Sequence, residues 1–310
     1  MKIAFVFPGQ GSQYVGMGKE IFEEYPVVRE TFIQASDILG YDIADLCFNG
    51  PAEELNKTFK TQPCILTTSI AILRVIEEKG IKPSVVAGHS LGEYSALVAA
   101  KAISFDDAVR LTEKRGHLMQ EAVPEGKGLM AAILGLDREK VDSICNSVSS
   151  GYVAPANYNC PGQIVIAGEK PAVEEAIELC KKAGAKRAVA LSVSAPSHCK
   201  LMEQASKKLG ELIDAIELKN PSIPIVNNAE AKFLYQSDEI KPSLIRQLNS
   251  PLLWEDSIKT ITNHGINTFI EIGPGKVLSG LIKRISPESK ILNVEDKKTL
   301  EIAFSFSVTT

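Results

Sequence analysis

The most reactive pattern in the sequence is Gly-His-Ser-Leu-Gly at residues 88–92, where a serine stands between two glycines. The short β-branched run Val85-Val86 precedes it, and a helical pattern over about 91–102 follows. Strand, sharp turn and helix in this order are typical of a nucleophile elbow, which lifts a serine hydroxyl out of its loop. The pattern therefore predicts Ser90 as a nucleophile toward carbonyl carbon. The alternative is a strand-to-helix turn whose serine only caps the helix.

A carbonyl attacked by Ser90 needs hydrogen-bond donors for the oxygen that becomes negative. The backbone N–H of Leu91, at the start of the elbow helix, is one candidate. The second is the backbone N–H of Gln10, in the glycine-rich loop 8–12 that follows a predicted buried strand over 3–7. We choose this loop because elbow enzymes take their second donor from another strand-to-helix loop. A plain turn is the alternative, since the loop matches neither a dinucleotide-binding fingerprint nor a P-loop.

A serine nucleophile also needs a base, and the chain has four histidines. His89 adjoins the serine and points elsewhere, His117 falls on the solvated edge of a predicted helix, and His264 lies at a predicted helix end. By elimination, His198 in the small-residue loop 194–198 is the predicted general base. It follows the serine in the chain, as the base does in elbow enzymes.

The predicted helix over 105–122 carries a cation among apolar residues. Ala108, Leu111 and Leu118 lie on one stripe of this helix, and Arg115 falls on the same stripe. A buried guanidinium needs an anionic or hydrogen-bonding partner, because burying it alone is costly. Two partners remain open: an internal aspartate or glutamate, or a carboxylate on a substrate, which the guanidinium would bind with two parallel hydrogen bonds.

Composition limits the class of protein. The chain has 310 residues, 45% of them hydrophobic, enough for one large domain or two smaller ones. The formal charge of −4 does not favour a nucleic-acid partner, and no run approaches the ~18 apolar residues of a membrane span, so we expect neither nucleic acid nor membrane. Six widely spaced cysteines without a Cys-x-x-Cys pair predict no metal site and no disulfide framework, and they favour a reducing cytoplasm.

The order of predicted elements indicates an α/β fold in two parts. Between 129 and 193 the pattern reads strand, helix, strand, strand, helix, strand, which is the ferredoxin-like plan. We expect a small ferredoxin-like domain at 125–197, inserted into a large α/β-hydrolase-like domain with a parallel sheet, formed by 1–124 and 198–298. Residues 299–310 are expected to form a C-terminal tail, of which residues 304–310 are expected to be loose.

Taken together, the motifs resemble those of the malonyl-CoA:acyl-carrier-protein transacylase family, and the resemblance spans about residues 3–298. The motifs that carry it are Phe-Pro-Gly-Gln-Gly-Ser-Gln at 7–13, Gly-His-Ser-Leu-Gly-Glu at 88–93, Arg115-Gly116 with Leu118-Met119-Gln120, Asn-Cys-Pro-Gly-Gln at 159–163, Ser-Ala-Pro-Ser-His at 194–198 and Ile-Gly-Pro-Gly at 272–275.

The resemblance implies transfer of a malonyl group from malonyl-CoA to the phosphopantetheine thiol of acyl carrier protein, in fatty-acid synthesis and without a cofactor. It implies a malonyl-serine intermediate on Ser90, with His198 as the base. Arg115 is similar to the family's clamp for the free malonyl carboxylate.

The resemblance also assigns positions around these groups. Gln10 and Leu91 look like the backbone donors to the oxyanion. Gln247 looks like the residue whose main-chain carbonyl orients the histidine, which makes a dyad rather than a triad.

One position departs from the family. Ser197 stands where the family usually has phenylalanine directly before the histidine, so an aromatic wall of the acyl pocket is missing and relaxed specificity toward methylmalonyl units remains open. The sequence is also compatible with a serine hydrolase or thioesterase that uses water as acceptor, and with a carrier-protein-binding scaffold whose serine is unreactive.

Overall fold

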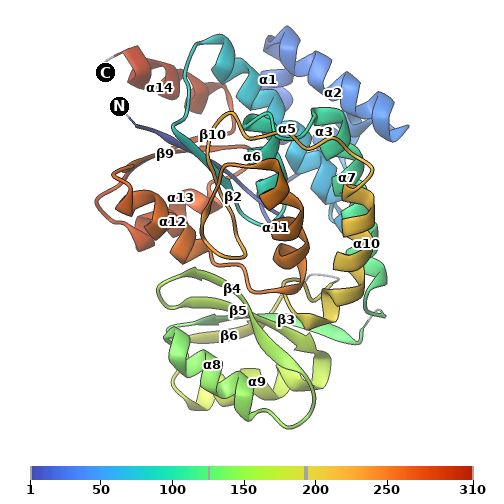
Figure 1. The fold of residues 1–310 in the computed structure, drawn as a ribbon, viewed down its shortest axis with the longest axis vertical. Coiled ribbons are helices and arrows are strands. Elements are labelled where there is room, and N and C mark those ends of the chain that lie inside the picture. Colours follow the sequence, from blue (N-terminus) through green and yellow to red (C-terminus); the bar gives the residue numbers. More distant parts are fainter. Residues whose placement is uncertain (1, 125, 192–194, 309–310) are drawn as a thin grey trace.

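The protein folds around two β-sheets, one below the other in Figure 1. The structure, a computed structural model, describes residues 2–124, 126–191 and 195–308. The strands of these residues are β1 (Ala4–Phe7), β2 (Val85–Gly88), β3 (Gly128–Leu134), β4 (Val153–Cys160), β5 (Gln163–Glu169), β6 (Arg187–Ala190), β7 (Ile225–Val226), β8 (Phe233–Leu234), β9 (Thr268–Ile272) and β10 (Lys290–Val294). The helices are α1 (Lys19–Glu24), α2 (Pro26–Leu39), α3 (Ile43–Asn49), α4 (Ala52–Leu55), α5 (Thr58–Glu78), α6 (Gly92–Ala99), α7 (Phe105–Glu121), α8 (Arg138–Ser147), α9 (Lys170–Lys182), the 3₁₀ helix η1 (Lys200–Met202), α10 (Glu203–Ile213), α11 (Ser237–Asn249), α12 (Trp254–Asn263), α13 (Val277–Ile285) and α14 (Lys297–Val308).

The larger sheet has the strand order β10-β9-β1-β2-β7-β8, and every pairing except that of β7 with β8 is parallel. Its central strands are buried along their whole length and nearly all apolar, as expected of a parallel sheet covered on both faces. Phe7 of β1 lies opposite Gly88 of β2, so the loops that follow these strands begin side by side. The predicted α/β class with a parallel sheet is confirmed.

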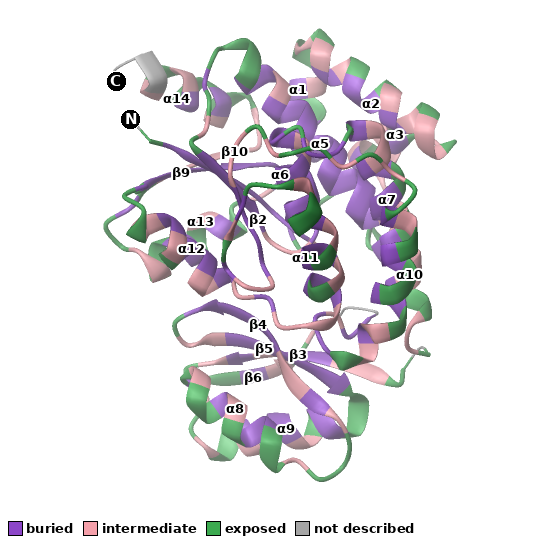
Figure 2. Cartoon of the chain, viewed as in Figure 1, coloured by how far each residue is buried: buried purple, intermediate pink, exposed green. Residues whose placement is uncertain are grey.

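Alternate residues of β1 face two different groups of helices. Phe5 and Phe7 belong to a core cluster with residues of α2, α5, α6 and α7, whereas Ala4 and Val6 belong to a cluster with α12 and α13. This division follows from the two-residue period of a strand. Figure 2 shows the central strands of the larger sheet as a buried layer between helices whose outer sides are exposed.

The smaller sheet is antiparallel and has the order β4-β5-β3-β6. Its elements follow one another as β3-α8-β4-β5-α9-β6, the order that the sequence predicted. Ile133 and Ile166 belong to one core cluster with residues of α8 and α9. Figure 1 shows these two helices on the same face of the sheet. On the other face, Met130 belongs to a small apolar cluster. This cluster also includes Cys199, which follows the last strand of the sheet in the chain.

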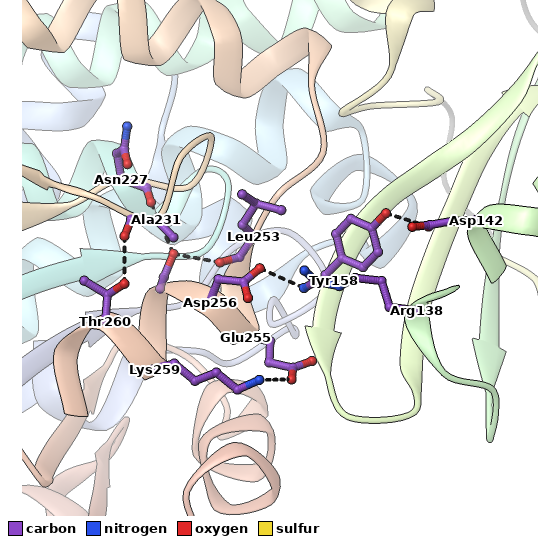
Figure 3. Close-up of polar contacts among 11 residues, drawn as sticks. Arg138, Asp142, Tyr158, Asn227, Ala231, Leu253, Glu255, Asp256, Lys259 and Thr260 are labelled. Carbon is purple, nitrogen blue, oxygen red and sulfur yellow. Dashed lines mark hydrogen bonds and ion pairs between the residues drawn. The ribbon is translucent and has the colours of Figure 1, made fainter. Parts of the chain in front are cut away.

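The two sheets are joined by contacts of α8 and β4 with α12 and the loop before it (Figure 3). Arg138 Nη2 lies 2.7 Å from Asp256 Oδ2, and the guanidinium lies over the Tyr158 ring, 4.0 Å from its centroid. Tyr158 N–H donates to the Leu252 carbonyl at 2.9 Å, and Leu252 N–H donates to the Ala156 carbonyl at 2.8 Å. These contacts fix the position of β4 relative to the larger sheet.

Two helices contain a proline in their interior. Pro63 and Pro242 lie inside α5 and α11, not at their starts where proline is favoured. The first turn of α11 has a capping box formed by Gln236 and Glu239. In α11, local capping therefore outweighs the start signal of the proline.

The C-terminal residues form α14, and the expectation of a loose segment is wrong for residues 304–308. Leu300 and Ala303 are buried in the larger core cluster. Asp296 Oδ1 accepts a hydrogen bond from Thr299 N–H at 2.8 Å and caps the helix. Apolar burial on one side of the helix stabilises a segment that composition alone suggested was free.

All six cysteines carry free and buried thiols. Among the helices of the described residues, none has the length and apolar character needed to cross a lipid bilayer.

Candidate active site

Ser90 occupies the sharp turn between β2 and α6, where the sequence predicted it. Its φ is +53°, in the left-handed region that residues other than glycine seldom adopt. The flanking glycines allow close passage of backbone: a Cβ on Gly92 would lie 2.0 Å from the Phe7 carbonyl oxygen, and one on Gly88 would lie 1.9 Å from the Gly92 carbonyl. The helix behind the turn ends at Ala99 and is shorter than predicted.

A side chain that the sequence analysis missed holds this strained turn. Asn228 Oδ1 accepts a hydrogen bond from Ser90 N–H at 2.7 Å, and Asn228 Nδ2 donates to the Gly88 carbonyl at 2.7 Å. Asn228 is fully buried and follows β7, the strand next to β2. The only sequence signal for it is the polar pair Asn227-Asn228 directly after a short apolar strand.

His198 approaches the elbow from the chain that follows the smaller sheet. Its Nε2 lies 2.8 Å from Ser90 Oγ, and its Nδ1 lies 2.7 Å from the main-chain oxygen of Gln247. Because a carbonyl oxygen only accepts, Nδ1 carries the proton and Nε2 accepts the hydrogen bond of the serine hydroxyl. Of the predicted loop 194–198, Ser194 lies outside the described residues.

The electrostatic surroundings keep the imidazole of His198 neutral. The residue is 2% exposed. Burial first, and then the positive charge of Arg115, lower the pKa of His198 to about 3. Near neutral pH Nε2 is therefore unprotonated and can take the proton of the serine hydroxyl, and a proton placed on the ring next to the cation is readily passed on.

The predicted inward position of Arg115 agrees with its burial, since the residue is 1% exposed. Nη1 donates to Gln62 Oε1 at 2.8 Å, and Nη2 donates to Gln247 Oε1 and to Ser90 Oγ, both at 3.1 Å. All three acceptors are uncharged, so the guanidinium has no internal carboxylate in direct contact among these partners. The guanidinium also lies 5.4 Å from the ring centroid of Tyr94.

The nearest acidic group is Glu93, which the sequence analysis placed in a motif without giving it a role. It is 1% exposed, and its Oε2 accepts hydrogen bonds from Gln247 Nε2 at 2.9 Å and from Asn228 N–H at 3.1 Å. Burial raises the pKa of Glu93 to about 7, against the opposing effect of these donors and of Arg115. Glu93 therefore titrates near neutral pH and neutralises the cation only in part.

The side chain of Gln247 connects these groups. Its Nε2 donates to the main-chain oxygen of Ser90 at 2.9 Å as well as to Glu93, while its main-chain oxygen meets His198. One buried glutamine thus contacts the serine, the histidine and the arginine.

The two predicted oxyanion donors lie on adjoining loops. Gln10 lines the same cleft as Ser90, and its side-chain Nε2 lies 3.4 Å from Thr58 Oγ1. A Cβ on Gly9 would lie 2.3 Å from the His89 carbonyl oxygen, which shows how closely this loop meets the elbow. Among the hydrogen bonds of the described residues, none has the backbone N–H of Gln10 or of Leu91 as its donor.

These residues open into a cleft of about 270 Å³ between the two sheets. Ser197 lines its wall, and Ser197 Oγ lies 3.6 Å from Met130 Sδ. The thioether of Met130 therefore lies against the side chain of Ser197. Asn157 and Asn159 of β4 also line the cleft.

The other three histidines take no part in the contacts of Ser90 Oγ. His89 also lines the cleft, and its Nε2 lies 2.9 Å from Asn159 Oδ1. His117 is half-buried and stacked on Phe59, so its predicted place on a solvated edge is only partly right. His264 caps the end of α12. The described residues contain no group of three or more histidine, cysteine, aspartate or glutamate side chains that could hold a metal ion.

Comparison with known proteins shows the family of the chain. A family model described as acyl transferase domain matches residues 4–302. The chain is 51% identical to the malonyl CoA-acyl carrier protein transacylase of Haemophilus influenzae, over 99% of both chains, and 54% identical to that of Escherichia coli K12, over 92% of this chain and 93% of the relative. Among solved structures, it is similar to a malonyl-transacylase in complex with a type II PKS acyl-carrier protein (TM-score 0.97, 51% identity, 99% and 100% covered) and to an acyl carrier protein S-malonyltransferase from Vibrio cholerae (TM-score 0.95, 49% identity, 98% and 100% covered). The chain therefore belongs to the acyl transferase domain family.

Proposed function

We propose that this protein transfers a malonyl group from malonyl-CoA to the phosphopantetheine thiol of acyl carrier protein, through a malonyl ester of Ser90. The observation that carries this proposal is the buried cation of Arg115, with Nη2 3.1 Å from Ser90 Oγ. The names of the relatives and the carrier-protein complex among the similar structures support the same substrate and acceptor.

In the first half of the reaction, His198 Nε2 takes the proton of the Ser90 hydroxyl while Oγ bonds to the malonyl carbonyl carbon. The N–H groups of Gln10 and Leu91 donate to the oxygen that becomes negative. When the carbon–sulfur bond breaks, the proton on His198 passes to the sulfur and CoA leaves as a thiol. The cation of Arg115 makes the imidazolium acidic and favours this second proton transfer.

In the second half, the phosphopantetheine thiol gives its proton to His198 Nε2, and its sulfur bonds to the carbonyl carbon of the ester. The bond from this carbon to Ser90 Oγ breaks, and His198 returns the proton to Oγ. The main-chain oxygen of Gln247 keeps the ring oriented through both halves, as expected of a dyad whose orienting group is uncharged.

Arg115 supplies the selectivity of this scheme. A guanidinium binds a carboxylate with two parallel hydrogen bonds, and in a buried site such a pair is strong when it is complete. The free carboxylate of a malonyl group is such an anion, and in malonyl-CoA it lies close to the thioester that reacts. A hydrolase acting on uncharged esters would have no use for this cation.

Intact-mass measurement after mixing with malonyl-CoA tests the proposal. We expect one malonyl adduct on the wild-type protein and none on Ser90→Ala, followed by transfer to acyl carrier protein when the carrier is added. An adduct that persists in Ser90→Ala, or a wild-type protein that takes up no malonyl group, would contradict it. Release of free malonate faster than transfer would assign a hydrolase instead.

We also propose a division of the fold that serves this chemistry. The smaller sheet, with its strand–helix–strand–strand–helix–strand order, supports a ferredoxin-like domain at 125–197. The parallel sheet with its serine elbow supports an α/β-hydrolase-like domain formed by 1–124 and 198–298. We assign α14 to the same domain. The cleft lies where the two would meet.

A further inference from the structure

We infer that Gln62 determines acyl selectivity in this protein, because it holds the guanidinium of Arg115 with an uncharged oxygen and leaves the positive charge for the substrate. This inference rests on the proposed function and assigns a role to a residue outside the predicted site. Gln62 lies in α5, is fully buried, and accepts a hydrogen bond from Arg115 Nη1 at 2.8 Å.

The orientation of the Gln62 amide is fixed by both of its neighbours. Oε1 faces the guanidinium, which only donates, and Nε2 faces Met119 Sδ at 3.2 Å, which only accepts. The amide therefore has no reason to flip, and Nη1 of Arg115 is held in one place. This leaves Nη2 directed toward Ser90 Oγ.

The usual partner of a buried guanidinium is a carboxylate, and this site lacks a direct one. None of the ion pairs among the described residues includes Arg115. Glu93 reaches it only through Gln247, and the raised pKa of Glu93 leaves that group partly protonated near neutral pH. The cleft next to Ser90 therefore keeps a positive charge that an entering carboxylate can neutralise.

A carboxylate in place of the amide would remove this charge. Glutamate has the size and shape of glutamine, so Gln62→Glu would form an internal ion pair with Arg115 with little change in packing. A malonyl carboxylate would then face a pair that is already neutral, whereas an acetyl group would lose nothing. Specificity is a difference between two affinities, and this substitution acts on one of them only.

The fold offers a matched control far from Ser90. Gln34 Oε1 accepts hydrogen bonds from Nη1 and Nη2 of Arg74, both at 3.2 Å, and neither residue lines the cleft. Gln34→Glu therefore makes the same change beside another guanidinium. Gln34 Nε2 also contacts Asp106, so this substitution places two carboxylates side by side and should lower stability. The variant therefore shows how a loss of stability alone affects selectivity.

The experiment measures kcat and KM with malonyl-CoA and with acetyl-CoA near neutral pH, with acyl carrier protein as acceptor. For Gln62→Glu we expect the ratio of malonyl to acetyl kcat/KM to fall roughly tenfold or more, mainly through the malonyl KM, while the acetyl value is unchanged or higher. Gln34→Glu should keep the wild-type ratio. A ratio for Gln62→Glu within about twofold of wild type, or an equal loss with both donors, overturns the inference.

A second variant separates charge from hydrogen bonding. Gln62→Met removes the acceptor without adding charge, so the ratio should stay within about threefold of wild type even if the malonyl KM rises. Collapse of the ratio in this variant overturns the inference, also if Gln62→Glu fails to fold. The wild-type malonyl adduct is measured in parallel: its absence would contradict the proposed function, whereas its presence with unchanged ratios contradicts only the role of Gln62.

Discussion

Arg115 Nη2 donates a hydrogen bond to Ser90 Oγ across 3.1 Å, and the same oxygen lies 2.8 Å from His198 Nε2. The guanidinium that we propose binds the far end of the acyl group therefore also donates a hydrogen bond to the nucleophile. On the proposed function, we expect a carboxylate bound by Arg115 to compete with the serine oxygen for Nη2. Binding of a dicarboxylic acyl group would then release Ser90 Oγ from this hydrogen bond.

Removal of this guanidinium should change selectivity more than reactivity. For Arg115→Ala we expect malonyl kcat/KM to fall by roughly 100-fold, since loss of one partner of a buried charged pair costs about 2–5 kcal/mol, while acetyl transfer falls much less. The malonyl kcat/KM of Arg115→Lys should lie between those of the wild type and Arg115→Ala, because lysine keeps the positive charge but cannot form the two parallel hydrogen bonds of a guanidinium. Steady-state rates with both donors measure this, and unchanged malonyl transfer in Arg115→Ala would refute the clamp.

The pH profile of acyl transfer should show a base with an unusually low pKa. Burial and Arg115 lower the pKa of His198 to about 3, so the acid limb of malonyl kcat/KM should lie far below the ordinary histidine value of about 6.5. In Arg115→Gln the acid limb should move to higher pH, because the repulsion from the cation is gone. Arg74→Gln is the matched control and should leave the limb in place. An acid limb near the ordinary histidine value in the wild-type protein would contradict the neutral, buried base.

The same pKa shift predicts how stability depends on pH. Between about pH 6.5 and pH 3 the unfolded chain binds a proton on His198 that the folded chain does not, so the contribution of this residue is complete above that range and is lost as the pH falls. The slope is about 1.4 kcal/mol per pH unit for one such group. Denaturant unfolding of wild type and His198→Gln at several pH values measures the difference. Parallel curves would show that the imidazole is not held neutral.

Asn228 should be needed to hold the strained backbone of Ser90. Asn228→Ala leaves Ser90 N–H and the Gly88 carbonyl without their partner, and we expect a loss of about 1–3 kcal/mol in the free energy of unfolding. We also expect a fall in kcat of roughly tenfold or more with little change in KM, because the nucleophile shifts.

The neighbouring Asn227 is the control for Asn228. It is equally buried and makes its own hydrogen bonds, to Ser243 Oγ at 2.8 Å and from Lys232 N–H at 2.9 Å, without touching the elbow. Asn227→Ala should therefore lower stability and leave kcat near the wild-type value. Equal kcat in both variants would assign Asn228 a structural role only.

Ser197 should decide how well a branched acyl group is accepted. In Ser197→Phe, the ring would compete with Met130 for the space next to the acyl group, since Ser197 Oγ lies 3.6 Å from Met130 Sδ. We expect the ratio of methylmalonyl to malonyl kcat/KM to fall by roughly tenfold, within the range of about 1–3 kcal/mol that one methyl group supplies. Ser197→Ala should keep the ratio, and a ratio that rises in Ser197→Phe would exclude this wall as the determinant.

The sequence by itself determined the residues whose signals are local. Ser90 follows from a strand, two glycines and a helix within one short stretch, and its turn needs no distant information. Arg115 follows from the helical period, which places it on the apolar face. His198 follows from the small number of histidines together with their contexts. The elbow and the inward cation rest on spacing along the chain, and spacing is what a sequence records.

Only the tertiary structure decided which side chains support these groups. Asn228 meets Ser90 because β7 lies beside β2, and Gln62 meets Arg115 because α5 packs against α7. Such hydrogen bonds join residues that lie far apart along the chain, and no periodic pattern in the sequence marks these residues. The α14 helix is a similar case, since the burial of Leu300 depends on the surface that it meets. Polar contacts of this kind depend on the distance and direction between side chains in space. The order of the strands in the sheet determines both, and no single segment of the sequence encodes that order.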